Sequence, residues 1–375
     1  MVACLSPNGA AVSQSDGPPS HIFIATWKGI RQLERTSSTT APWRQISAAL
    51  HDVHISSIAP DASSGRLFAG SHWQGVYTSD DHGRTWQRSV DGHAFALAAH
   101  PSNGVIFAGL APSALLRSRD SGAHWERIEF NAAADRGKWS FMPLYPHHVK
   151  NLVFHPGDPR VVFACVEQGA LLKSLDNGDT WSEITTCWHA SDRFYHDAHR
   201  LIISEKNPDL MYLTTGDGLR YTTDGARTWS RLTSASGHRI GYPDSVFFDP
   251  ADDGTLYLAG AEDNPGAWTE ETANPAIMRS HDGGHTWTEI MSGLPRPIRG
   301  SIEAMSLHID SERTTFFVGT AVGQVYASED RGASWTCIAE GLPPITKAGH
   351  FRRFLPNDVR ERTENELAAL MAGSA

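Results

Sequence analysis

One octapeptide recurs six times in this 375-residue chain, and its spacing limits what the chain can fold into. The pattern is Ser/Thr-x-Asp-x-Gly-x-Thr/Ser-Trp, with substitutions in the second and fourth copies. The copies begin at Ser79, Ser118, Ser174, Thr222, Ser280 and Ser328, at intervals of 39, 56, 48, 58 and 48 residues. Self-similarity at a period of this size indicates a repeat architecture in which each unit is one supersecondary element.

Each octapeptide carries the residues of a tight hairpin turn. Asp and Ser side chains, such as that of Asp81, accept hydrogen bonds from nearby backbone N–H groups, and Gly83 supplies a positive φ. Trp86 can then pack the turn onto the sheet. Strand-like segments such as 66–70 and 75–79 precede the turn. Four short strands in each unit of about 45 residues are typical of the blades of a β-propeller.

The chain ends decide how many blades there are. Segments 21–26, 29–33 and 43–46 are interpreted as the last three strands of a first blade, and segment 345–354 can supply its missing innermost strand. Such closure would remove exposed strand edges. We therefore predict an all-β fold: a seven-bladed β-propeller with four-stranded blades, shared-blade closure and a short C-terminal helix over 361–371. The expected organisation is an N-terminal extension (1–20), a single propeller (21–356) and a C-terminal tail or helix (357–375).

These boxes resemble those of the BNR/Asp-box β-propeller superfamily, and the resemblance covers about residues 21–355. That superfamily includes sialidases, sortilin-type receptors, photosystem assembly factors and WD40-YVTN-BNR-like proteins, and this chain is most similar to the uncharacterised "exo-alpha-sialidase-like" branch. The resemblance implies that the box aspartates are turn residues at the blade periphery, away from the ligand face. It specifies the fold far more than the function.

A sialidase-type glycosidase is disfavoured by the same comparison. Sialidases of the superfamily clamp the substrate carboxylate with three arginines, pair a Tyr nucleophile with Glu, and carry an Arg-Ile-Pro-type motif in the first blade. Here the corresponding segment, 26–31, reads Thr-Trp-Lys-Gly-Ile-Arg and lacks the proline. No arginine recurs at matched positions of the blades.

Composition excludes several classes of protein. The net charge is −10, from 32 Lys and Arg against 42 Asp and Glu, and the basic residues are dispersed, which argues against nucleic-acid and membrane partners. Four dispersed cysteines form no CxxC pair, so we expect neither a disulfide scaffold nor a cysteine zinc site. The N-terminal residues lack the pattern of a secretory signal, and we expect a cytoplasmic protein of undetermined oligomeric state.

Histidines gather in the loops that lead into the innermost strands. Eleven of the 19 histidines fall in these loops, in the other loops of the same face, or beside them. Imidazole and carboxylate groups brought together from separate blades can bind a divalent transition metal. The predicted metal ligands are His54, His93, His148, His199, Asp244 and His350.

The same loops supply the other candidate site residues. The predicted catalytic residues are His196, Tyr242, Glu303 and Arg200, and the predicted binding residues are Trp27, Trp73, Trp139, Trp268 and Glu167. Titratable groups around a metal can perform general acid–base chemistry, and tryptophans can form apolar walls. We therefore expect a metal-dependent hydrolase or lyase acting on a small organic or sugar-acid ligand. The alternative is a non-catalytic propeller that binds a ligand or assembles with a protein.

Overall fold

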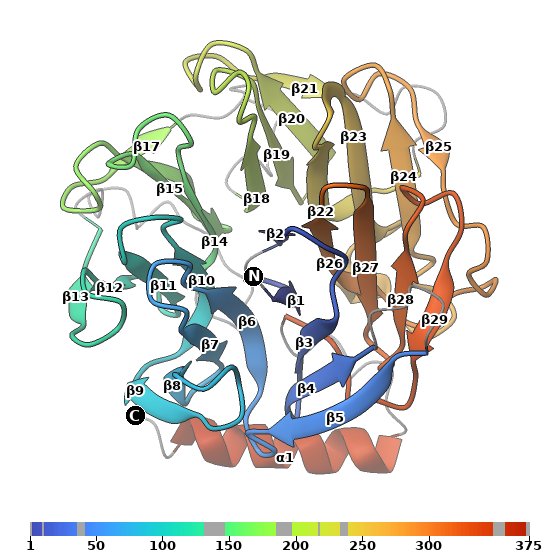
Figure 1. The fold of residues 1–375 in the computed structure, drawn as a ribbon, viewed down its shortest axis with the longest axis horizontal. Helices are drawn as coiled ribbons and strands as arrows, with labels where there is room; N and C mark the ends of the chain where they lie inside the picture. The colour runs from blue at the N-terminus through green and yellow to red at the C-terminus, as the bar shows by residue number, and fades with distance from the viewer. Residues whose placement is uncertain are drawn as a thin grey trace.

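The structure is a computed structural model, and it describes residues 2–9, 11–35, 42–130, 147–184, 197–216, 218–232, 239–347 and 357–372. Within these ranges, seven β-sheets are arranged as blades around a central channel (Figure 1). The sequence prediction of a seven-bladed, four-stranded propeller is confirmed. The C-terminal helix is also present, as α1 (Asn357–Ala372).

Six blades follow the chain in order, each from its innermost to its outermost strand. Blade 2 comprises β6 (Ile55–Pro60), β7 (Leu67–Ser71), β8 (Gly75–Ser79) and β9 (Gln87–Val90). Blade 3 comprises β10 (Ala94–Ala99), β11 (Ile106–Leu110), β12 (Leu115–Ser118) and β13 (Glu126–Ile128). Blade 4 comprises β14 (His148–Phe154), β15 (Val162–Glu167), β16 (Leu171–Ser174) and β17 (Ser182–Ile184). Blade 5 comprises β18 (Ala198–Ile203), β19 (Met211–Thr215), β20 (Gly218–Thr222) and β21 (Ser230–Leu232). Blade 6 comprises β22 (Tyr242–Asp249), β23 (Asp252–Ala261), β24 (Ala276–Ser280) and β25 (Thr288–Glu289). Blade 7 comprises β26 (Ile302–Ile309), β27 (Thr314–Thr320), β28 (Val325–Ser328) and β29 (Thr336–Ala339).

The first blade is closed by the N-terminus. It comprises β1 (Ala3–Leu5), β3 (His21–Thr26), β4 (Gly29–Glu34) and β5 (Arg44–Ala49), and β1 pairs with β3 in parallel. The predicted shared-blade closure by segment 345–354 is therefore wrong: β1 is the innermost strand, and residues 345–347 form no strand. Side chains also join the first and seventh blades, where Leu5 and Ile24 of the first pack with Phe317 of the seventh.

The N-terminal segment also enters the central channel (Figure 1). After β1, the backbone N–H of Asn8 donates to the carbonyl of Ser56 on β6, and the Asn8 carbonyl accepts from Leu97 on β10. The chain then turns back as β2 (Val12–Gln14), which pairs in parallel with β26 of the seventh blade. Residues 3–9 and 11–14, expected to be an extension, thus add two strands to the propeller and occupy its centre.

The octapeptides form the predicted turns between the third and fourth strands. In the first copy, the Asp81 carboxylate accepts from the Thr85 N–H (2.9 Å) and the Thr85 hydroxyl (2.7 Å). Gly83 has φ +81°, and a Cβ there would lie 2.3 Å from the ring of Phe23 in the neighbouring blade. Only glycine therefore satisfies both the left-handed conformation and the close approach.

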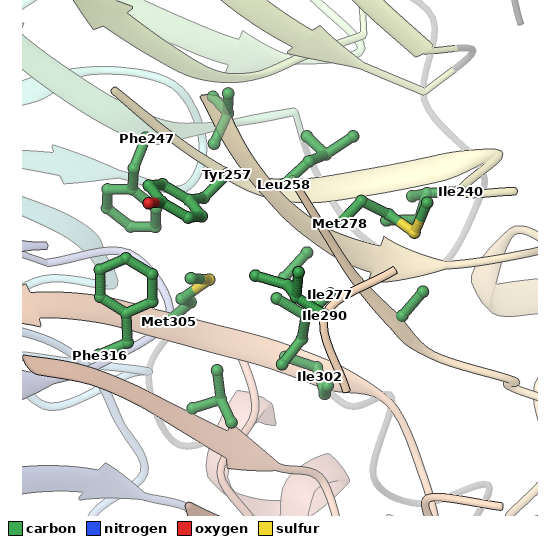
Figure 2. Close-up of a cluster of buried hydrophobic side chains, with 14 of the residues drawn as sticks. Ile240, Phe247, Tyr257, Leu258, Ile277, Met278, Ile290, Ile302, Met305 and Phe316 are labelled. Carbon is green, nitrogen blue, oxygen red and sulfur yellow. The ribbon is translucent and has the colours of Figure 1, made fainter. Parts of the chain in front are cut away.

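Apolar side chains between blades hold the ring together. Figure 2 shows one such cluster, in which Phe247 and Tyr257 of the sixth blade face Met305 and Phe316 of the seventh. The rings of Tyr257 and Phe316 meet edge-on, with centroids 4.6 Å apart. Burying a side chain of this size stabilises the fold by about 1.5–3 kcal/mol, so these contacts hold neighbouring blades together. Among the described residues, α1 does not have the length and apolar character of a membrane-crossing helix.

Candidate functional site

A β-bulge recurs at the start of the innermost strand in six of the blades. On each of these strands the pairing with the second strand skips one residue, which leaves that residue without a partner in the ladder. The unpaired residues are Ser56, Phe95, Lys150, His199, Asp244 and Glu303. A bulge re-aims a side chain and is enriched beside functional sites. We call the end of the channel where these strands begin the upper face, and the end where they finish, on the side of the octapeptide turns, the lower face.

A second layer lies two residues before each bulge. It consists of His54, His93, His148, Asp197, Tyr242 and Ser301, one from each of the same six blades. All these residues are buried. The two layers bring polar side chains from six blades to the upper face, so this end of the channel is the candidate site.

One part of the upper face is a stack of aromatic rings. His54 lies flat on His72, with ring centroids 4.0 Å apart, and His93 Nε2 lies 3.0 Å from His72 Nδ1. Trp73 covers His93 at 3.7 Å. Burial, followed by the charges of His148 and His54, lowers the pKa of His93 from 6.5 to about 2. Burial also holds the pKa of His72 well below its usual value, so these two rings are neutral at ordinary pH.

The other part is a network of charges centred on Glu167. Its Oε1 accepts from Lys150 Nζ (3.1 Å) and Tyr242 Oη (3.3 Å), and its Oε2 lies 2.9 Å from His148 Nε2. Burial alone would raise the pKa of Glu167, but Lys150 and His148 outweigh it and hold the pKa well below the usual value. Burial and the surrounding carboxylates raise the pKa of Tyr242 well above 10, so its phenol stays protonated and donates.

The segment 345–347 completes this network from above. Lys347 Nζ pairs with the Asp244 carboxylate, which also lies 3.8 Å from Lys150 Nζ. Thr346 donates its hydroxyl to Glu303 Oε2 at 3.0 Å. Burial lowers the pKa of Lys150, whereas for Lys347 the carboxylate of Asp244 outweighs burial and raises the pKa. Both lysines are nearly inaccessible to solvent and are positioned by carboxylates.

His199 has an arrangement typical of a metal ligand. Its Nδ1 lies 3.2 Å from the Pro243 carbonyl, which can only accept, so Nδ1 carries the proton. Its Nε2 faces Asp197 Oδ1 at 3.3 Å and Glu167 Oε1 at 3.7 Å without hydrogen-bond geometry to either. One ligand atom from each of these three residues lies within 4.8 Å of the other two. A neutral imidazole with its outer N–H on a backbone carbonyl is how metal-bound histidines are held.

The predicted metal ligands divide between these two parts. His54 and His93 belong to the ring stack, and His148 and Asp244 are paired with Glu167 and the lysines. Among the described residues, the three-residue group that can hold a metal contains only His199 of the predicted ligands. His350, together with the predicted residues His196 and Trp139, lies outside the described residues.

The remaining predicted residues have distinct places. Tyr242, Glu303 and Glu167 lie in the charged network. Trp268 is 2% exposed and meets Tyr242 edge-on, so it is a wall and not an open platform, and Trp27 packs at the edge of the same cluster. The sequence predicts Arg200 to be a catalytic residue beside the histidines. Instead, its guanidinium donates to the Pro7 carbonyl, and the residue lines a cavity toward the lower face.

Sequence reasoning missed Lys150, Asp197, His72 and Lys347 as site residues. Lys150 follows His148 by two residues on one strand, and a blade-by-blade alignment of the bulge positions would have placed it with His199, Asp244 and Glu303. Lys347 carries no such signal, because it comes from a segment outside the repeat.

The repeat itself identifies the family. The model of the BNR/Asp-box repeat matches residues 77–88, the first octapeptide with its flanking residues, and the structure shows the same turn six times around the ring. The chain is a BNR-type β-propeller.

Proteins similar to this BNR-type propeller include xyloglucanases and a propeller bound to a peptide. Xyloglucanase Xgh74A of Acetivibrio thermocellus is 26% identical over 238 residues, which is 55% of this chain and 27% of that protein. The crystal structure of an ancestral GH74 enzyme superposes with a TM-score of 0.58 at 17% identity, over 75% of this chain and 38% of the other. The structure of YCF48 bound to D1 peptide superposes with a TM-score of 0.54 at 14% identity, over 84% of this chain and 92% of the other. The chain thus spans about a quarter of the xyloglucanase, and the structural likenesses show the fold alone.

Proposed function

We propose that this BNR-type propeller is a metal-dependent hydrolase that acts on a carbohydrate at its upper face. The observation that carries the proposal is the orientation of His199, whose Nε2 lone pair is directed at the carboxylates of Asp197 and Glu167. A lone pair held against two buried anions is unfavourable unless a cation lies between them. A divalent metal or a second proton on the ring would provide it.

The charge balance of the network favours the divalent cation. Four buried or nearly buried carboxylates, those of Glu167, Asp197, Asp244 and Glu303, are accompanied by two ammonium groups, those of Lys150 and Lys347. With neutral histidines, these groups carry a net charge of −2. A divalent cation restores neutrality in one step, whereas protons would have to charge both His148 and His199.

The surrounding groups suit hydrolysis. A metal held by Asp197, His199 and Glu167 would act as a Lewis acid and would activate water near neutral pH. The Tyr242 phenol remains a hydrogen-bond donor, and Lys150 keeps Glu167 ionised. Trp73 offers a half-buried ring beside the site. The xyloglucanase relatives support a carbohydrate as the substrate, and elimination from a sugar acid remains the second reaction that this donor set allows.

Metal titration of the purified full chain tests the proposal. We expect one Mn²⁺ or Zn²⁺ to bind at micromolar concentration, and Asp197→Asn to weaken binding at least tenfold. The matched control is Asp91→Asn, a carboxylate that is 84% exposed on the rim of the second blade. Release of reducing ends from a panel of β-glucans, with and without EDTA, then reports the reaction. A chain that binds neither metal at millimolar concentration, or whose turnover EDTA does not change, contradicts metal dependence; a chain without turnover on any glycan contradicts the hydrolase.

A peptide-binding propeller is the second candidate. It is favoured by the extent of the likeness to YCF48 bound to D1 peptide, which covers 92% of that chain, where the GH74 likeness covers 38%. A peptide array probed with the wild type and with Glu167→Gln separates the candidates. Binding to a defined peptide that requires Glu167, in a chain without glycan turnover, would favour this function.

A further inference from the structure

A cavity of about 420 Å³ opens on the lower face, at the opposite end of the channel from the charged network. Its walls come from the ends of five innermost strands and from β2 of the N-terminal segment. Apolar side chains form most of the wall, including Leu97, Leu152, Phe154, Ile202, Phe247 and Leu307. A concave site of this size with apolar walls and few polar groups is typical of a small-molecule site.

Two hydrogen-bond donors lie at the inner end of this cavity. Asn151 and Arg200 each follow the bulge residue of their strand directly, and each is 6% exposed. The Asn151 Oδ1 accepts from the Leu201 N–H at 3.1 Å, which fixes the amide so that its NH₂ group is the free end. Within the described parts of the chain, this NH₂ group donates to no protein atom.

Arg200 forms no ion pair with any of the described residues. Its Nη2 donates to the Pro7 carbonyl at 2.7 Å, and its guanidinium lies 6.0 Å from the centre of the Phe247 ring. No carboxylate of the described residues lies within ion-pair distance of it, and the more distant charge of Asp244 only partly offsets burial, which lowers the pKa of Arg200. A guanidinium with five donors that is buried without an anion in direct contact is unfavourable, because burial removes its water.

The N-terminal segment closes the cavity at this end. Gly9 and Ala11 line it, and a Cβ on Gly9 would lie 2.3 Å from the Ile58 carbonyl oxygen, so the segment fits closely against the second blade. Arg200 and Asn151 lie near the starts of their strands, at the inner end of the lining, while Glu205, Lys206 and Asp253 lie at its outer end. Its polar end is inside and its entrance faces solvent.

We propose that this cavity binds an amphipathic carboxylate with a medium-length alkyl chain. The carboxylate accepts hydrogen bonds from Arg200 and Asn151, and the alkyl chain lies along the apolar wall toward the lower face. A guanidinium and a carboxylate form paired hydrogen bonds that are stronger than neutral ones, which selects an acid over an alcohol of the same length. A cationic amphiphile would place its charge against Arg200 and is rejected.

Isothermal titration of the full chain with decanoate, decanol and decyltrimethylammonium tests the proposal. We expect decanoate to bind with one-to-one stoichiometry and at least tenfold more tightly than decanol, and the cation not to bind. In Arg200→Gln the affinity for decanoate falls at least tenfold, to that of decanol, while decanol binding is unchanged.

A second variant covers the case in which Arg200→Gln fails to fold. Asn151→Asp keeps the oxygen that accepts from Leu201 and replaces the free NH₂ group with an oxygen, so it should abolish the preference for decanoate. Ala98→Trp fills the cavity and should abolish binding of both decanoate and decanol. Equal affinities of the wild type for acid and alcohol, binding that survives Ala98→Trp, or no binding of decanoate at millimolar concentration would each overturn the proposal.

Discussion

Phe95 lies between two groups of buried histidines, one packed against aromatic rings and the other placed beside carboxylates. On one side its ring contacts His93, at 4.5 Å between centroids, and on the other it stacks on His148 at 4.0 Å. His93 belongs to the stack with His54, His72 and Trp73. His148 instead belongs to the charged network, with its Nε2 atom 2.9 Å from Glu167 Oε2.

The difference shows that neighbours and not residue type decide what a histidine does. In the ring stack, burial lowers the pKa of His93 to about 2, because no carboxylate among the described residues there stabilises the charged form of the ring. In the charged network, the carboxylate of Glu167 faces both His148 and His199. The stack is a packing element, whereas the network holds the groups that can bind a cation. Removing one member from each side distinguishes these roles.

Replacement of Glu167 is expected to have the largest effect. Glu167→Gln keeps the shape but leaves Lys150 and His148 without their shared anion, and breaking a buried ion pair in this way costs about 3–5 kcal/mol. Urea denaturation should show this loss in the free energy of unfolding. The control is Glu312→Gln, at a glutamate that is 72% exposed, which should stay within about 0.5 kcal/mol. A loss below about 1 kcal/mol for Glu167→Gln would mean that the network does not depend on this charge.

Acid should destabilise the protein through the ring stack. Unfolded histidines have a pKa near 6.5, whereas His93 and His72 stay neutral in the folded protein far below that value. The unfolded chain therefore binds more protons, so the stability from these groups is present above pH 6.5 and is lost as the pH falls. The slope approaches about 1.4 kcal/mol per pH unit for each histidine, or about 2.7 for both.

Urea denaturation at pH 6 and pH 5 measures this slope, in a window above the usual pKa of carboxylates. The double variant His72→Phe, His93→Phe should lower the slope by most of that amount. His51→Gln, at an exposed histidine on the same face, should leave the slope unchanged. An unchanged slope in the double variant would show that the two rings are protonated in the folded protein.

The fold could be predicted from the sequence because each octapeptide specifies its own turn. Asp81 and Gly83 act within a few residues, so the six blades that carry an octapeptide could be predicted without long-range information. The innermost strand of the first blade escaped prediction because β1 has three residues and pairs in parallel with β3. A segment so short has no readable period, and its position depends on the completed ring.

The candidate site could be predicted only as a face. The positions of His148, His199 and Asp244 at the starts of strands placed them together. Which of them share an anion depends on the bulges, since one extra residue turns Lys150 and Asp244 into the channel. The contribution of Lys347 depends on segment 345–347 crossing the upper face, which no repeat encodes.

The smallest expected effect is the contrast between His93→Phe and His148→Phe, the same substitution on the two sides of Phe95. Phenylalanine at 93 keeps the stack with Trp73 and loses one hydrogen bond to His72, a cost of about 1 kcal/mol that added apolar burial partly offsets. Phenylalanine at 148 keeps the contact with Phe95 but leaves Glu167 Oε2 without its donor, which adds about 1–2 kcal/mol. Thermal denaturation of the two variants at pH 7.5 measures the difference, and metal titration should show the larger defect for His148→Phe. Equal losses would mean that Phe95 does not divide the upper face, and that its histidines form one structural ring.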